Sequence, residues 1–236
     1  MPSVTLNKFH KMKKVFLYLF LIVSVGEIIS TLVDSPMLHI ICKPAIMVLL
    51  GLYYWTVQRS RQQSIVPVLL LAIIFSCAGD VLLMFQLSNP NYFMVGLAAF
   101  LIAHVLYIFA YQQHQNESSV GELQGIQKIR FALPILLSGT GLSVILYPHL
   151  GELKTPVLLY AGVLTYMVLV ALFRFGRTSA GSFAMVFGGA ILFMISDSLL
   201  AVNKFLEPLS GGNFWIMSTY ISAQFLIVKG LLGHTD

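Results

Sequence analysis

The hydrophobic positions of this chain form long runs that are separated by short polar segments. Eight runs are mostly apolar over about 20 residues, which is the length that a transmembrane helix requires. These predicted helices lie at residues 15–33, 38–56, 67–87, 93–111, 131–147, 156–174, 181–202 and 214–232. Most connections are short, whereas the polar link 112–130 is long. The pattern predicts an all-α fold, a polytopic membrane helical bundle that forms one integral membrane domain over residues 1–236.

The first hydrophobic run has some features of a signal peptide, because four lysines precede it. The run is about 19 residues long, however, whereas the apolar region of a signal peptide has about 7–15 residues and ends at a small-residue cleavage site. No such site follows here. We therefore interpret residues 15–33 as the first transmembrane helix.

Composition supports a membrane protein and excludes most other classes. Hydrophobic residues make up 58% of the chain and charged residues 10%, against roughly 45–50% and about 25% in soluble domains. Mean hydropathy is +0.86. A soluble enzyme and a disordered chain are excluded, since so few charges cannot cover so much apolar surface. The net charge of +5 is spread between apolar segments, so no nucleic-acid partner is indicated.

Lysine and arginine are distributed unevenly between the two sides, which predicts the orientation. With a cytoplasmic N-terminus, the cytoplasmic set is Lys8, Lys11, Lys13, Lys14, Arg59, Arg61, Lys128, Arg130, Arg174, Arg177 and Lys229. The opposite side carries only Lys154 and Lys204. We expect a multi-pass protein of the cell membrane with both termini in the cytoplasm. The sequon Asn116-Glu117-Ser118 then lies on the cytoplasmic side and should not be glycosylated.

Ionisable residues inside the predicted helices are the first candidates for function. Each costs about 2.5–3.5 kcal/mol on insertion scales. They are Glu27, Lys43, Asp80, His104 and Asp197. At about 1.5 Å per residue, four of them lie roughly 8–10 Å from the predicted outer helix ends, and His104 lies about 15 Å deep. Because all of them fall in the outer half of the bilayer, the sequence predicts one polar cavity that opens toward that half.

Helical spacing adds polar neighbours to these residues, since side chains three or four positions apart share a face. The expected stripes are Ser24, Glu27 and Thr31; His39 and Lys43; His104 and Tyr107; and Tyr220 and Gln224. Gly79, beside Asp80, would let another helix or a ligand approach closely. Cys42 and Cys77 lie within predicted helices and are interpreted as small core residues.

The segments around the two aspartates resemble each other. Both contain Asp-x-Leu-Leu, and Tyr107 follows Asp80 by the same interval as Gln224 follows Asp197. The resemblance is consistent with a parallel repeat of four plus four helices.

Two carboxyl groups in one cavity of low dielectric constant are not both ionised easily, so one can hold a proton while the other acts as a base. Such a pair suits acid-catalysed cleavage through an oxocarbenium ion. The chain contains no G-x-S-x-G, C-x-x-C or H-E-x-x-H motif, and we expect neither a serine nucleophile, nor a metal, nor a cofactor.

Several of these segments together resemble the YhhN-like lysoplasmalogenase family. They are Gly79–Met84, Ser196–Ala201, Lys43-Pro44, Ala103-His104 with Tyr107, and Ala223-Gln224. The two aspartate segments are the most specific, and the eight-helix length extends the resemblance over nearly the whole chain. It implies a hydrolase that cleaves the vinyl ether of a lysophospholipid, the lysoplasmalogen, and releases a fatty aldehyde and a glycerophospho-head group. The implied partners are this substrate and membrane lipids; the oligomeric state is not indicated.

On this hypothesis either Asp80 or Asp197 donates the proton, and the other carboxylate stabilises the cation and activates water. Lys43 would contact the phosphate, and Glu27 would balance Lys43 or attract a cationic head group. The remaining candidates would orient the glycerol hydroxyl or the water. These are His104, Tyr107, Tyr220 and Gln224.

Other interpretations remain open at the level of sequence. Both aspartates could be structural and hydrogen-bonded between helices, Lys43 could only neutralise an aspartate, and His104 could only pack. Paired intramembrane acids also occur in proton- or ion-coupled transporters of small molecules or lipids. A lipid-binding membrane protein without turnover is the third possibility.

Overall fold

The computed structural model describes residues 3–116 and 121–234, with the backbone alone for residues 3–7. The sequon at Asn116 extends into residues that lie outside this part. The chain divides into two compact units, residues 1–106 and 107–236.

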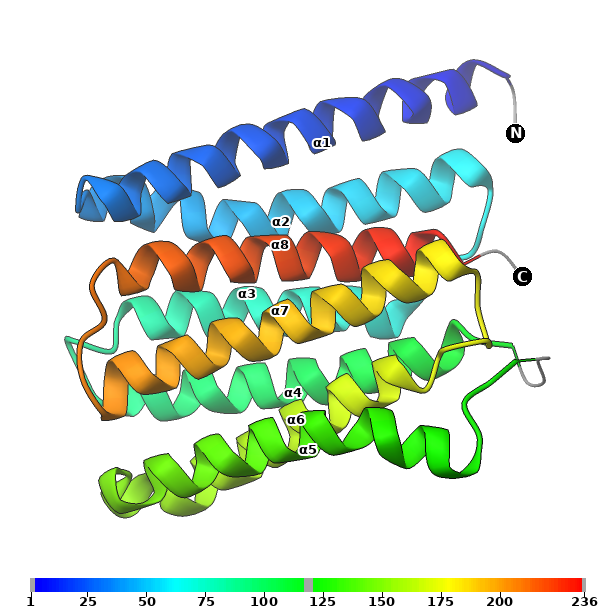
Figure 1. The fold of residues 1–236 in the computed structure, drawn as a ribbon. Coiled ribbons are helices and arrows are strands. Elements are labelled where there is room, and N and C mark those ends of the chain that lie inside the picture. The colour runs from blue at the N-terminus through cyan, green and yellow to red at the C-terminus, as the bar shows by residue number, and fades with distance from the viewer. Residues whose placement is uncertain (1–2, 117–120, 235–236) are drawn as a thin grey trace. The chain divides into compact units, whose positions relative to one another are not determined.

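Eight α-helices make up the described chain, and every one is long and apolar enough to cross a membrane, which confirms the predicted all-α class. In Figure 1 their colour follows the chain from blue at the N-terminus to red at the C-terminus. The helices are α1 (Ser3–Leu32), α2 (Pro36–Arg61), α3 (Pro67–Met84), α4 (Asn91–Gln113), α5 (Gly125–Leu146), α6 (Lys154–Leu172), α7 (Ala180–Phe205) and α8 (Gly212–Leu232). Two short 3-10 turns, Tyr147–His149 and Gly151–Leu153, connect α5 to α6.

The predicted spans find every helix but misplace several ends. Helix α1 begins at Ser3, far ahead of the predicted start, and α2 continues to Arg61. Lysine and arginine are good helix formers, so a helix continues through polar residues at which an apolar run stops. Helix α5 begins at Gly125, which shortens the predicted link 112–130 for the same reason.

In the first unit, α2 lies between α1 and α3 and packs against both. Proline begins both α2 and α3, at a position where its missing N–H would have no helical partner. Asp34 adopts a left-handed conformation (φ 48°) in the turn before α2. The core of α2 is apolar and fully buried, with Ile46, Met47 and Leu50 at its centre.

Helices α3 and α4 approach closely at two glycines. A Cβ on Gly79 would lie 2.5 Å from the Phe100 ring, and a Cβ on Gly96 would lie 2.9 Å from the Leu83 side chain. Both distances are too short for real atoms, so only glycine allows this contact. Gly79 precedes Asp80, so this close packing constrains the backbone that carries that carboxyl group. The expectation that Gly79 permits close approach is confirmed, with Phe100 as the neighbour.

In the second unit, glycines likewise allow α7 and α8 to approach each other closely. A Cβ on Gly189 would lie 2.9 Å from the Ala223 carbonyl oxygen, and a Cβ on Gly230 would lie 2.7 Å from Val186. Close approach of this kind allows van der Waals contact along the two helices, which is the main attraction between helices in lipid.

Arg174, in the turn after α6, ties several segments of the second unit together. It is fully buried, and its Nη2 donates to the His114 carbonyl oxygen (2.8 Å) and to Ser182 Oγ (3.1 Å). Ser182 Oγ in turn donates to the Gly230 carbonyl oxygen (2.7 Å). Burial lowers the pKa of Arg174 to about 10, so the side chain remains charged at neutral pH. These acceptors stabilise the buried charge.

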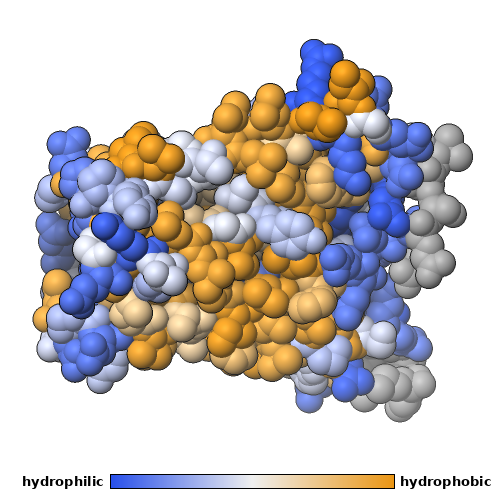
Figure 2. All heavy atoms as spheres, turned by 90° about the horizontal axis from the view of Figure 1, so that it is seen from below, coloured by the Kyte–Doolittle hydropathy of each residue, from blue (hydrophilic) through white to orange (hydrophobic). Residues whose placement is uncertain are grey.

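The surface has the pattern expected in a bilayer. Figure 2 shows mostly apolar residues over the middle of the visible face, with hydrophilic residues gathered toward two opposite ends of it. Large apolar side chains are exposed on the described helices, including Ile22, Ile74 and Val144. Contact with hydrocarbon tails accounts for this exposure.

The contact between Gly79 and Phe100 predicts the effect of a single methyl group. We expect Gly79→Ala to lower the midpoint of thermal unfolding in detergent by several degrees, because the ring must shift. In Gly162→Ala, where nothing lies within 4 Å of the added Cβ, the midpoint should stay or rise, since alanine favours helix. Size-exclusion chromatography after heating measures both. Equal midpoints for the two variants would contradict the packing described.

Candidate functional site

Glu27 and His39 form a close polar contact between α1 and α2. His39 Nδ1 lies 2.7 Å from Glu27 Oε1, and the Glu27 side chain is fully buried. Ser30 Oγ donates to Glu27 Oε2 at 3.3 Å from the next turn of α1. The Glu27 carboxylate of α1 therefore points toward α2, where His39 contacts it.

Lys43 and Asp80 form the second pair of this unit, between α2 and α3. Lys43 Nζ lies 3.9 Å from Asp80 Oδ1, with 13% and 3% of the two side chains exposed. Pro44 follows the lysine inside α2 and removes one backbone donor from the helix. The Cys77 thiol lies 3.8 Å from the Pro44 carbonyl oxygen, which joins α3 to α2 at the level of the pair.

The two pairs share α2, since His39 and Lys43 lie one turn apart on it. The sequence predicted that both residues occupy one face, and each contacts an acid on a different neighbouring helix. Lys43 pairs with Asp80, and Glu27 pairs with His39 rather than with Lys43. His104 of α4 is fully buried in the same unit. The first unit thus places Glu27, Lys43 and Asp80 along α2.

Asp197 has a partner that sequence reasoning missed. The Tyr160 hydroxyl of α6 donates to Asp197 Oδ2 of α7 at 2.5 Å, and Asp197 itself is half-buried. Tyr160 lies about 6 Å from the predicted outer end of its helix, close to the depth of Asp197. The depth comparison that selected the acids would therefore have found Tyr160 if tyrosines of every helix had been included.

Tyr107 and Gln224 form a buried hydrogen bond in the second unit. The Tyr107 hydroxyl donates to Gln224 Oε1 at 2.5 Å, and both side chains are fully buried. Gln224 Nε2 has no hydrogen-bond partner among the described residues. A buried donor of this kind costs about 1–3 kcal/mol unless something accepts from it. Gln224 therefore offers a fixed donor to an acceptor that enters the unit.

Tyr220 lies one turn before Gln224 on α8 and is buried. Its ring meets Phe193 of α7 edge to face, with centroids 5.5 Å apart. Ser196, beside Asp197, donates from Oγ to the Ile216 carbonyl oxygen at 2.9 Å. These contacts hold the segment of α7 that carries Asp197 against α8.

The eight predicted site residues divide between the two units. Glu27, Lys43, Asp80 and His104 belong to the first, and Tyr107, Asp197, Tyr220 and Gln224 to the second. The meeting of Asp80 and Asp197 in one cavity stays a prediction. Within the described ranges, no group of three histidine, cysteine or acidic side chains could hold a metal ion. Cys42 is buried and Cys77 is half-buried, and both are free thiols.

Each unit thus presents one of the two predicted catalytic aspartates, held by a polar partner from a neighbouring helix. Asp80 faces an ammonium group, and Asp197 faces a phenolic hydroxyl. Chemically, such acids can accept a proton, donate one, or stabilise a nearby cation.

The pair of Lys43 and Asp80 predicts coupled effects on stability. We expect Lys43→Met and Asp80→Asn each to lower the thermal midpoint, because each leaves an opposite buried charge without its partner. The double variant should lose clearly less than the sum of both losses. Thermal unfolding of the four proteins in one detergent gives the coupling. Strictly additive losses would show that the two groups do not interact.

Comparisons with known proteins give a consistent result. The profile described as the YhhN family matches residues 38–231. The chain is 32% identical to "Lysoplasmalogenase TMEM86B" of Homo sapiens over 68% of its own length and 62% of the human protein. It is 29% identical to "Lysoplasmalogenase TMEM86A" of Homo sapiens over 93% of its length and 85% of that protein.

The similarity extends to bacteria. The chain is 30% identical to "Lysoplasmalogenase" of Mycobacterium tuberculosis over 67% of its length and 58% of that protein. The matched part therefore spans less than two thirds of this relative and of human TMEM86B. No solved structure gives a significant match.

Proposed function

Because this chain belongs to the YhhN family, we propose that it is a membrane hydrolase that cleaves the vinyl ether bond of lysoplasmalogens. The observation that carries the proposal is its similarity, over most of its length, to relatives named lysoplasmalogenase from mammals and mycobacteria. Eight apolar helices agree with a substrate that resides in the membrane.

The chemistry requires an acid and a base near one bond. Protonation of the alkene carbon that does not bear oxygen leaves an oxocarbenium ion at the carbon that does. Water adds to this carbon and loses a proton to a carboxylate, which gives a hemiacetal. The hemiacetal then breaks its bond to the glycerol oxygen, which takes up a proton, and the products are a fatty aldehyde and a free hydroxyl group. No step requires a nucleophilic side chain.

Asp80 and Asp197 supply the two carboxyl groups in this proposal. Sequence depth supports their joint action, because both lie at a similar distance from the predicted outer helix ends. Their environments differ, which favours a division of roles: Lys43 faces Asp80, whereas a neutral phenol donates to Asp197. An acid beside an ammonium suits the carboxylate that stabilises the cation. Asp197, with Tyr160, is then the proton donor.

Other side chains position the substrate. Lys43 lies beside Asp80 and can contact the phosphate as a point charge. Gln224 Nε2 can donate to a glycerol oxygen or to water, with Tyr107 holding the amide in place. Glu27 is already in contact with His39, so we assign this pair to fixing α1 against α2. His104 and Tyr220 are assigned to the wall of the site.

The proposal predicts the outcome of a direct assay. Purified protein in detergent should release aldehyde from lysoplasmenylcholine, and Asp80→Asn and Asp197→Asn should each lower kcat by at least about a hundredfold, since general acid–base catalysis contributes that much. Tyr160→Phe should lower kcat less. The matched control is Asp34→Asn, the same change in an exposed turn, where asparagine accepts the positive φ.

Each contrary result has a specific meaning. Full turnover in either aspartate variant removes that residue from the reaction. Cleavage of the ester analogue in place of the vinyl ether identifies a lysophospholipase. No turnover by the unaltered protein on either lipid overturns the proposed hydrolase.

A further inference from the structure

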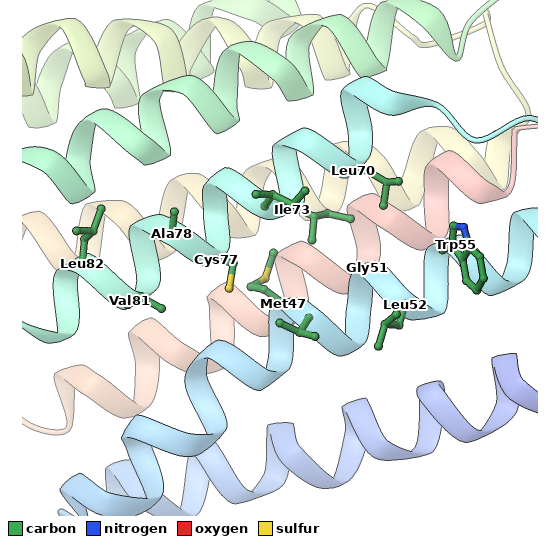
Figure 3. Close-up of a pocket in the computed structure, with 12 residues that line it drawn as sticks. Met47, Gly51, Leu52, Trp55, Leu70, Ile73, Cys77, Ala78, Val81 and Leu82 are labelled. Atoms are coloured by element: carbon green, nitrogen blue, oxygen red, sulfur yellow. The ribbon is translucent and has the colours of Figure 1, made fainter.

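An apolar groove runs between α2 and α3 in the first unit. It has a volume of about 920 Å³, and its walls include Met47, Gly51, Trp55, Leu70, Cys77 and Leu82. Figure 3 shows Trp55 and Leu82 toward opposite ends, with the sulfur atoms of Met47 and Cys77 near the middle. On α3 the groove follows the helix from Leu70 to Leu82, which is about 18 Å. The groove is therefore a long apolar slot.

The groove lies beside the pair of Lys43 and Asp80. Lys43 is one turn before Met47 on α2, and Asp80 is three residues after Cys77 on α3, so each lies one turn from a residue that lines the groove. Their charged groups lie 3.9 Å apart. The charged pair thus lies next to the Leu82 end of the groove, whose own lining is aliphatic apart from the sulfur atoms of Met47 and Cys77 and the indole of Trp55.

We propose that this groove holds the single hydrocarbon chain of the lysolipid, with its vinyl ether beside Asp80. The inference rests on the proposed function and specifies which part of the protein holds the substrate. A lysolipid has an anionic phosphate next to one long chain, which matches an ammonium group bordering one long apolar slot. The volume falls within the range of small-molecule sites, and van der Waals contact along the slot holds the chain in place.

Trp55 lines the end of the groove that lies away from the charged pair. Its ring meets Phe9 edge to face with centroids 5.8 Å apart, and the Arg59 guanidinium lies 5.9 Å from its centroid. These contacts from α1 and α2 hold the indole in place. The position of Trp55 therefore limits the length of chain that fits, and the protein should discriminate between substrates by chain length.

The first test changes the width of the groove. Gly51 lines the groove eight residues, about 12 Å, after Lys43 on α2, in the part that only the longer chain reaches. Gly51→Phe should therefore lower kcat/KM for an 18-carbon substrate by about tenfold more than for a 10-carbon substrate. A tenfold change corresponds to about 1.4 kcal/mol of lost van der Waals contact. Val25→Phe is the control, since Val25 is 60% exposed on α1 outside the groove. An unchanged ratio in Gly51→Phe contradicts the proposal.

The second test measures binding in a protein whose groove is intact. Trp55 and Trp215 are the two tryptophans, so Trp215→Phe leaves Trp55 as the only tryptophan. A non-cleavable alkyl-ether lysophosphocholine with bromine at the chain end should quench its fluorescence. Excess unbrominated lysolipid should restore the signal, whereas two-chain phosphatidylcholine should not. No quenching, or equal relief by both lipids, overturns the inference.

The two proposals fail in different ways. Turnover with an unchanged chain-length ratio and no specific quenching leaves the hydrolase intact and removes the groove. Specific quenching without turnover of any lysolipid retains the chain site and removes the hydrolase.

Discussion

An acid inside a membrane needs a partner, and this constraint shapes both units of the protein. The dielectric constant of the hydrocarbon region is low, so an unpaired carboxylate there is costly. Asp80 meets Lys43, Glu27 meets His39, and Asp197 meets Tyr160. Every one of these pairs joins two helices, so the groups that suit the proposed reaction also hold the bundle together. The helices around each acid cannot shift without separating such a pair.

Close helix packing fixes the positions of the helices that carry these pairs. Gly79 allows the Phe100 ring to touch the backbone beside Asp80, and Gly189 allows α8 to approach α7. In lipid, where hydrophobic attraction between helices is weak, such contacts supply much of the association. The polar residues of each unit therefore lie on a backbone whose position is fixed by small residues. Precision of this kind favours a site that must place an acid against one carbon atom.

The sequence predicted the helices well because bilayer thickness requires about 20 apolar residues. It predicted the helix ends less well, since polar helix formers extend α1 and α2 beyond their apolar runs. It identified the ionisable residues but not every partner: a helical spacing rule relates residues on one helix, whereas Tyr160 contacts Asp197 from another. For the same reason, which of His39 and Lys43 contacts Glu27 depends on how α1 and α2 rotate against each other. The four-plus-four repeat stays a prediction.

The account depends on Asp80 and Asp197 acting on the same bond, which requires that they lie within reach of one lipid carbon. Cross-linking measures this directly. In a Cys42→Ser, Cys77→Ser background, Asp80→Cys and Asp197→Cys are combined, a protease site is placed between α4 and α5, and a short bifunctional thiol reagent is added. The account predicts that the cleaved halves stay joined on a denaturing gel, whereas Asp80→Cys with Ile195→Cys, at an exposed position of α7, does not join them. Halves that separate as readily as in the control would contradict it.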